Sequence, residues 1–291
     1  MITILDGGMG QELIKRDVAT RTGLWSAQAL LDAPDMVAQV HRDYITAGAR
    51  IIITNSYSTI PSYLSKVGMA ARFEELSALA ARIARKVADE SEHDVLVAGS
   101  MPPLDESYRA DLVPADEIAM PLYRAIANAV NADVDLFICE TMSCAREARN
   151  AVSAATEISA GCKPVYVSWS LDEKPGGGLR SLESIADAFA ALDEFDVQAF
   201  MFNCTSLEAI SAGLAELGPL TDKPIGAYPN RLHIPDGWTL DSSVKSTYKE
   251  ITIEEYIAAA GRWIELGATI IGGCCGIGPE YISALNESLN T

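Results

Sequence analysis

The sequence has few basic residues and no long apolar run. Its 22 lysines and arginines stand against 40 aspartates and glutamates, which gives a net charge of −18 over 291 residues. Nucleic acids and anionic membranes select basic surfaces, so the charge argues against both as partners. No apolar run approaches the ~18 residues of a membrane span. Met1 leads into a short apolar run rather than a basic-then-apolar signal segment. We therefore expect a cytoplasmic protein that binds small molecules, as a monomer or small homo-oligomer.

Histidine is also scarce, with three residues at positions 41, 93 and 233. The first two lie on or just after helical patterns, and His233 lies in a long polar loop. A cysteine nucleophile needs a neighbouring base, which is most often histidine. The sequence therefore gives poor support to chemistry by a cysteine–histidine pair.

Short apolar runs alternate with longer helical patterns throughout the chain. We expect strands at residues 2–5, 50–54, 95–98, 136–139, 165–168, 199–202, 224–227 and 269–271. Helical spacing follows at residues 35–47, 70–89, 115–132, 146–159, 184–192, 207–217 and 253–266. Apolar strands that alternate with helices predict a parallel sheet. Eight units in this length fit a (β/α)8 barrel of typically ~250 residues, with a doubly wound open sheet as the alternative. No linker composition divides the chain, so we expect one domain over residues 1–291.

Unusual residues cluster where the predicted strands end. These clusters are Asp6-Gly-Gly, Asn55, Glu140, Asn203-Cys204, Tyr228-Pro-Asn and Gly273-Cys-Cys. Barrel enzymes carry their chemistry at the carboxyl ends of the strands, so the clusters predict a site there. The polar segment 229–250 is either a substrate-facing loop or a plain surface excursion.

Six cysteines are scattered through the chain, which fits reduced thiols better than a disulfide framework. Cys274 and Cys275 lie in a glycine-rich break after a strand, and glycine lets the backbone leave strand geometry there. Cys204 ends another strand that feeds the same barrel mouth. Three thiolates match a zinc site with one open position, typical of catalytic zinc. The alternatives are buried cysteines that act as small hydrophobes, or a direct thiol nucleophile.

A zinc ion with three thiolates carries a net charge of about −1 and is a poor activator of water. It suits binding of an exogenous thiol as thiolate, which then attacks an electrophilic carbon. Asp6 and Glu140 are carboxylates at two strand ends and suit a bound cation. The alternative for each is helix capping or a surface salt bridge.

Together these motifs resemble the homocysteine S-methyltransferase family. The most specific are Asn-Cys at 203–204 and Gly-Gly-Cys-Cys-Gly at 272–276; weaker matches occur, in the family's order, at 5–10, 24–27, 40–49, 54–57, 139–141 and 227–230. The resemblance implies a (β/α)8 barrel that holds zinc on Cys204, Cys274 and Cys275. It also implies that homocysteine binds through its sulfur at the fourth position of the metal.

The resemblance further implies the residues that bind the amino acid. Asp6 and Glu140 would hold its ammonium group, and backbone N–H groups of Gly7, Gly8 and Met9 would take its carboxylate. Asn55, Asn203 and Tyr228 are further candidate substrate-binding residues, with local loop hydrogen bonding as the alternative.

The implied reaction moves a methyl group from a sulfonium donor, S-methylmethionine or S-adenosylmethionine, to homocysteine and gives methionine. Trp25, Tyr57 and Trp238 are candidates for a cation–π wall, although each also suits packing. Arg231 departs from the small residues that the family usually has there, and an inward arginine would disfavour a cationic donor.

Three alternatives stay open. One is a betaine-like donor or another thiol or selenol acceptor. Another is a barrel that binds zinc and a thiol without methyl transfer. The third is a zinc-free lyase or isomerase with Glu140 as base.

Overall fold

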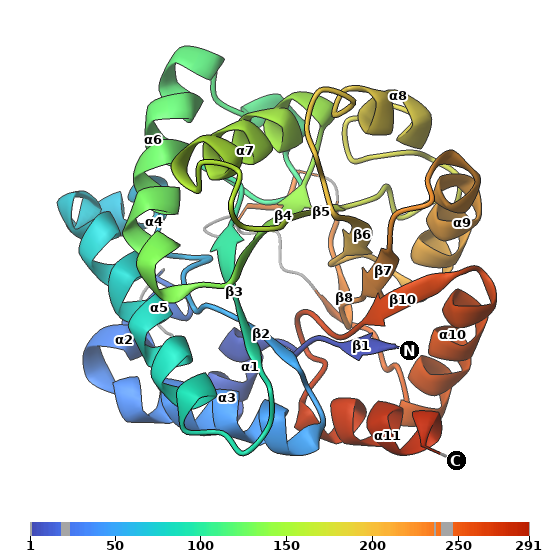
Figure 1. Ribbon diagram of the computed structural model, residues 1–291, viewed down its shortest axis with the longest axis horizontal. Helices are drawn as coiled ribbons and strands as arrows, with labels where there is room; N and C mark the ends of the chain where they lie inside the picture. The colour runs from blue at the N-terminus through green and yellow to red at the C-terminus, as the bar shows by residue number, and fades with distance from the viewer. Residues whose placement is uncertain (1, 19–23, 236, 240–246, 291) are drawn as a thin grey trace.

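The computed structural model describes residues 2–18, 24–235, 237–239 and 247–290. Eight parallel strands form one barrel, seen along its axis in Figure 1. They are β1 (Thr3–Ile4), β2 (Ile51–Ile53), β3 (Leu96–Met101), β4 (Leu136–Met142), β5 (Val165–Trp169), β6 (Ala199–Asn203), β7 (Ile225–Tyr228) and β10 (Ala268–Ile271). The prediction of a (β/α)8 barrel is confirmed, and the open-sheet alternative is wrong.

The barrel closes between its first two strands. The strand order is β1-β10-β7-β6-β5-β4-β3-β2, so β1 and β2 lie at the two ends of the hydrogen-bonded series. A parallel bridge between Leu5 and Ile51 joins them, and Arg50 N donates to Ile4 O at 2.8 Å. Because β6 and β10 both pair with β7, the strand ends that carry Cys204 and the Cys274–Cys275 pair are separated by one strand.

Helices surround the barrel on its outside (Figure 1). They are α1 (Met9–Lys15), α2 (Ala27–Asp32), α3 (Pro34–Ala47), α4 (Pro61–Ser65), α5 (Phe73–Asp89), α6 (Asp116–Val130), α7 (Ala145–Ile158), α8 (Ile185–Ala190), α9 (Leu207–Leu217), α10 (Ile253–Glu265) and α11 (Pro279–Leu289). Short 3-10 turns lie at Ala70–Arg72, Ala110–Leu112, Asn131–Asp133 and Gly218–Leu220.

The predicted helices agree with the observed ones to within a few residues. The helix predicted at 70–89 begins with a 3-10 turn before α5, and the one predicted at 207–217 coincides with α9. No range was predicted for α1, α2, α4 or α11. The first three have seven residues or fewer, so they show little helical periodicity.

Side-chain alternation along the strands divides the core in two. On β4, Leu136 and Ile138 point into the barrel, whereas Phe137 and Cys139 belong to the layer between the barrel and the helices. Since side chains alternate along a strand, Glu140 is the next residue to point inward. On β6, Met201 points into the barrel, and by the same alternation Asn203 is the next residue to point inward. The inward positions therefore change from apolar to polar as each strand approaches its carboxyl end.

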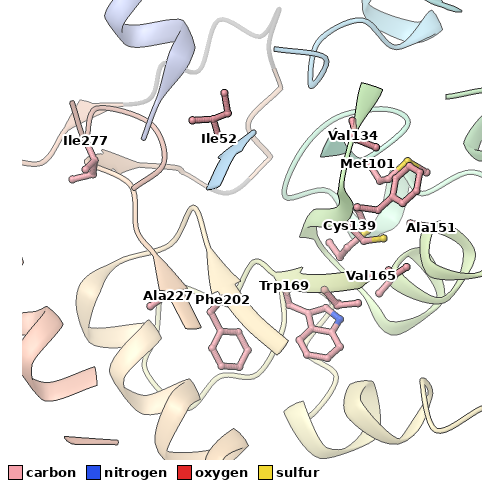
Figure 2. Packing of buried hydrophobic residues seen from close by; sticks show 14 of the residues in the cluster. Ile52, Met101, Val134, Cys139, Ala151, Val165, Trp169, Phe202, Ala227 and Ile277 are labelled. Atoms are coloured by element: carbon pink, nitrogen blue, oxygen red, sulfur yellow. The ribbon is translucent and has the colours of Figure 1, made fainter. Parts of the chain in front are cut away.

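The outer layer fixes these strands in place. Figure 2 shows Trp169 beside Val165 and Phe202 near Ala227, so large and small side chains lie next to each other in this layer. Trp169 stacks on Phe200 with 5.9 Å between ring centroids. Dense packing of this kind holds the strand ends rigidly, which a site built from several strands requires.

The long segment after β7 holds a small hairpin that was not predicted. Its strands β8 (Leu232–His233) and β9 (Thr247–Tyr248) pair antiparallel. Each strand has two residues, which is too short for an alternating pattern to show in the sequence.

Candidate active site

The two adjacent cysteines lie in a tight loop between β10 and α11. Gly276 has a φ of +82°, a left-handed conformation that suits glycine, and Ile277 N closes a turn on Cys274 O at 3.0 Å. A Cβ on Gly273 would lie 2.2 Å from the Ile277 side chain, so only glycine fits there. Cys274 N donates to Pro229 O at 2.8 Å, which fastens the loop to the end of β7.

Cys204 reaches the same point from the end of β6. Its φ is +53°, the left-handed region that non-glycine residues rarely adopt, and this turn aims the sulfur at the barrel mouth. Buried Asn230 donates from Nδ2 to Cys204 O at 3.0 Å. A side chain from the end of β7 therefore holds this turn. The sequence marks Asn230 as part of the Tyr228-Pro-Asn cluster but does not predict this supporting contact.

The three sulfurs converge as predicted. Cys204 Sγ lies 2.8 Å from Cys274 Sγ and 4.0 Å from Cys275 Sγ, and all three sulfurs lie within 4.8 Å of one another. A tetrahedral zinc with Zn–S bonds of about 2.3 Å holds its sulfurs roughly 3.8 Å apart. The donor set and its spacing therefore fit a thiophilic metal ion with one further position for a ligand.

Hydrogen bonding polarises this cluster. Hydrogen bonding with the side chains of Cys274 and Cys275, together with a hydrogen bond from the Tyr108 hydroxyl, holds the pKa of Cys204 well below its ordinary value. The bond to Cys204 raises the pKa of Cys274 in turn. The metal-free cluster therefore favours a thiolate at Cys204.

Tyr108 was missed by sequence reasoning. Its hydroxyl lies 3.0 Å from Cys204 Sγ, although the residue belongs to the loop between β3 and α6. Burial raises the pKa of Tyr108 far above its ordinary value, so the hydroxyl stays protonated and donates a hydrogen bond to the sulfur. No local pattern marks this tyrosine, because the contact depends on how a long loop folds over the barrel.

Two buried carboxylates lie beside the thiol cluster, as predicted. Asp6 Oδ2 accepts a hydrogen bond from Ile53 N at 2.8 Å, and Glu140 Oε1 accepts one from Ser100 Oγ at 2.5 Å. Burial raises the pKa of Asp6 well above its ordinary value, and the nearby charge of Glu140 raises it further. Burial raises the pKa of Glu140 to about 7. A cation bound between them would stabilise the ionised form of both carboxyl groups.

The glycine turn after β1 packs directly on the cysteine loop. A Cβ on Gly8 would lie 2.6 Å from Cys274 O, so glycine is required for this close approach. Gly8 N donates to Ile277 O at 3.0 Å and is already occupied. The first turn of α1, which begins at Met9, presents further N–H groups, since the first residues of a helix lack intrahelical partners.

Asn203 occupies a different place from the other candidates. Its Oδ1 accepts hydrogen bonds from Thr141 N at 2.9 Å and from Ser168 Oγ at 2.8 Å, and its Nδ2 donates to Thr141 Oγ1 at 2.8 Å. These bonds join the ends of β4, β5 and β6. The amide therefore ties the strand ends together beneath the pocket, and direct substrate binding by Asn203 stays a prediction.

Asn55 and Tyr228 both line the pocket. Asn55 Nδ2 donates to Ser26 O at 3.1 Å, which holds the loop that carries Trp25. The buried Tyr228 hydroxyl faces Ser168, but no atom of the described residues is in hydrogen-bonding position to it. An unpaired buried hydroxyl at a pocket wall is available to a ligand.

Apart from Asn203 and Asn230, the site residues described above line one pocket at the carboxyl end of the barrel. Its polar and sulfur-bearing lining includes Asp6, Asn55, Glu140, Cys204, Cys274 and Cys275. Its aromatic lining comprises Trp25, Tyr57, Tyr63, Tyr108, Tyr228 and Trp238. The three residues proposed as a cation–π wall thus all reach the pocket. None of the described residues that line it is a lysine, arginine or histidine.

Part of the segment 229–250 also faces this pocket, through Leu232 and Ile234. Arg231, at the start of the segment, lies elsewhere. Its guanidinium stacks over the Tyr281 ring at 5.2 Å and donates to Gly276 O at 3.4 Å. The concern that this arginine repels a cationic donor is therefore removed by its position.

Comparison with known proteins agrees with this geometry. A family model described as homocysteine S-methyltransferase matches residues 3–289. The chain belongs to this family. Homocysteine S-methyltransferase YbgG of Bacillus subtilis (strain 168) is 31% identical over 98% of this chain and 93% of its own length. Selenocysteine methyltransferase of Astragalus bisulcatus is 29% identical over 99% of this chain and 92% of its own length.

Solved structures of the family show the same fold. The crystal structure of the homocysteine methyltransferase MmuM from Escherichia coli in its metallated form has a TM-score of 0.82 and 28% identity, over 99% of this chain and 96% of that one. The oxidized form of MmuM has a TM-score of 0.81 and 30% identity.

As a member of the homocysteine S-methyltransferase family, the chain is an enzyme that transfers a methyl group to homocysteine. Its three clustered cysteines form a group that could hold a metal ion. In the part of the chain that the structure describes, no helix is long and apolar enough to cross a membrane.

Proposed function

We propose that this enzyme moves a methyl group from a sulfonium donor, S-methylmethionine or S-adenosylmethionine, to homocysteine and that its metal is zinc. The charge of the pocket carries this proposal. Two carboxylates, three cysteine thiols and six aromatic rings line it, and none of its described lining residues is basic. Such a pocket favours a positively charged methyl donor and disfavours an anionic one such as a methylated folate.

The chain's own residues would orient both substrates. Asp6 and Glu140 would take the ammonium group of homocysteine, and N–H groups at Gly7 and Met9 would take its carboxylate. Zinc on Cys204, Cys274 and Cys275 would supply the positive charge that keeps the acceptor sulfur a thiolate at neutral pH.

The aromatic walls would then set the donor opposite the acceptor. Tyr57 and Trp238 would hold the sulfonium by cation–π attraction and direct its methyl group toward the acceptor sulfur. A new S–CH3 bond forms while the donor C–S bond breaks, and its electron pair leaves with the neutral sulfide. In-line placement of the two substrates provides much of the rate. Neither Asp6 nor Glu140 is needed as a base for this attack.

A donor screen tests the proposal. Zinc-loaded enzyme is incubated with homocysteine and, separately, S-methylmethionine, S-adenosylmethionine, betaine or a methylated folate, and methionine is measured by mass. We expect methionine with a sulfonium donor and none from Cys204→Ser enzyme. Methionine from betaine or folate alone would overturn the assignment of the donor. The cysteines need a reducing compartment, so we propose that the enzyme works in the cytosol.

A further inference from the structure

Tyr108 contacts the thiol cluster from the roof of the pocket. The Tyr108 hydroxyl donates a hydrogen bond to Cys204 Sγ at 3.0 Å. Among the described residues, no tyrosine hydroxyl donates to the other two sulfurs. Tyr108 has a φ of +67°, a left-handed conformation that is rare for a bulky residue. The surrounding structure must hold this backbone, which suggests that the direction of the ring matters.

Two further contacts fix the ring of Tyr108. The Arg180 guanidinium lies 5.0 Å from the ring centroid, and the Trp238 ring meets it edge-on at 5.8 Å. The Arg180 side chain is only 9% exposed. A buried arginine on an aromatic ring is a strong attraction, because little water competes for the charge.

Glu173 holds Arg180 in that position. Glu173 Oε1 accepts from Arg180 Nη2 at 2.9 Å, and Glu173 Oε2 pairs with Lys249 Nζ at 3.2 Å. Three side chains in series, Glu173, Arg180 and Tyr108, thus end at the sulfur of a metal ligand. Nothing in the binding of homocysteine or donor described above uses them.

We infer that Tyr108 is a positioning residue that draws negative charge from the Cys204 sulfur and so permits a second anionic sulfur to bind beside the cluster. This inference rests on the proposed function. With a divalent ion, three thiolates carry a net charge of about −1, and the homocysteine thiolate adds another negative charge. A hydrogen bond to a ligand sulfur offsets part of that repulsion, since partners of metal ligands tune the ligands' electron density. Arg180 acts through Tyr108 by holding its ring.

Loss of the Tyr108 hydroxyl should affect the binding of homocysteine but not the binding of the donor. Loss of the hydroxyl leaves the cluster more negative, which weakens binding of anionic homocysteine thiolate and does not weaken binding of a cationic donor. Tyr108→Phe should therefore raise the dissociation constant of homocysteine by about tenfold, in the range seen when a partner of a metal ligand is removed. The KM of the donor should change by less than about twofold under the same reasoning.

A spectroscopic measurement reports the electron density on the ligand sulfurs directly. Cobalt(II) replaces the metal in wild-type, Tyr108→Phe, Arg180→Met and Tyr123→Phe proteins, and the sulfur-to-cobalt charge-transfer band is recorded. An electron-richer sulfur releases its electron at lower energy, so the band should move to longer wavelength in Tyr108→Phe and by less in Arg180→Met. Tyr123 is the matched control, since it is a buried tyrosine on α6 and lies outside the pocket lining.

The outcomes are distinct. A wild-type band with no shift in Tyr108→Phe, or a shift that Tyr123→Phe shares, overturns the inference and leaves the proposed function standing. A wild-type protein with no sulfur-to-cobalt band overturns the metal assignment and the inference with it. A shifted band together with weakened homocysteine binding, measured by calorimetry, supports the inference.

Discussion

Cys204 Sγ and Cys274 Sγ lie 2.8 Å apart although 70 positions separate them in the sequence. The two residues leave strands β6 and β10, which both pair with β7. A contact between them at the carboxyl end of the barrel brings sulfur ligands from two strands to one point. This relationship determines what the site can bind, and it leads to the first prediction.

Replacement of a single cluster cysteine should remove the metal. Cys204→Ser, Cys274→Ser and Cys275→Ser each replace a soft sulfur with a weaker ligand and leave two thiolates, too few for a stable site. Bound zinc, measured by atomic emission after gel filtration, should fall from about one ion per chain to near zero. Cys162→Ser is the control, because Cys162 is exposed and outside the cluster. Zinc retained by one of the three variants removes that residue from the ligand set.

Loss of a carboxylate should weaken binding of homocysteine and not of the donor. Asp6→Asn and Glu140→Gln keep the shape of each side chain and remove the charge that would pair with the ammonium group. We expect the KM of homocysteine to rise by roughly 10- to 100-fold, the range for a hydrogen bond between charged groups. Since Glu140 binds the cation only when ionised, kcat/KM for homocysteine should rise with pH through about 7 in the wild type. That step should be absent in Glu140→Gln. A pH profile unchanged by the substitution argues against Glu140 as the ammonium ligand.

The buried Glu140 should also destabilise the substrate-free protein at high pH. Its folded-state pKa of about 7 lies above the ordinary value of 4.5, so the folded state binds more protons between these pH values. Stability therefore falls as pH rises from 4.5 to about 7 and stays lower above that. Metal-free Glu140→Gln lacks this effect and should be more stable than the wild type at pH 8, by on the order of 3 kcal/mol. Denaturant melts at pH 5 and pH 8 measure the difference, and an equal difference at both values contradicts the prediction.

Substitution in the aromatic wall should weaken binding of the donor, whereas substitution of Arg231 should leave it unchanged. Trp238→Leu removes a ring from the pocket and should raise the KM of a sulfonium donor by about three- to tenfold, as expected for a lost cation–π contact. Arg231→Met should leave that KM within about twofold, because the guanidinium stacks on Tyr281 rather than in the pocket. Steady-state kinetics with varied donor at saturating homocysteine gives both values. A large effect of Arg231→Met would show that the side chain reaches the donor.

Much of the site could be predicted because it lies where strands end. Apolar runs locate the strands, and the residue that follows each run is at the mouth of the barrel, which placed Asp6, Glu140 and Cys204 correctly. The convergence of Cys204 with Cys274 could also be predicted, because alternate strands of a barrel contribute side chains to the same layer. Local patterns sufficed for these residues because their positions depend on the barrel and not on loop structure.

The remainder depended on contacts that no local pattern records. Tyr108 reaches Cys204 through a loop whose course is set by Arg180 and Trp238, both distant in sequence. Asn203 carries the expected motif, yet its amide is occupied by Thr141 and Ser168. The position of Arg231 depends on Tyr281, which lies 50 positions farther along the chain. Side-chain direction in loops is a tertiary property, and it needed the structure.

The placement of the three cysteines has a mechanical consequence. An ion shared by the ends of β6 and β10 would bridge across β7 and act as a staple on one wall of the barrel. Catalytic competence and resistance to unfolding would then be lost together on chelation, because the same bonds serve both. Metal supply would regulate how long each enzyme molecule survives in the cell as well as how fast it works.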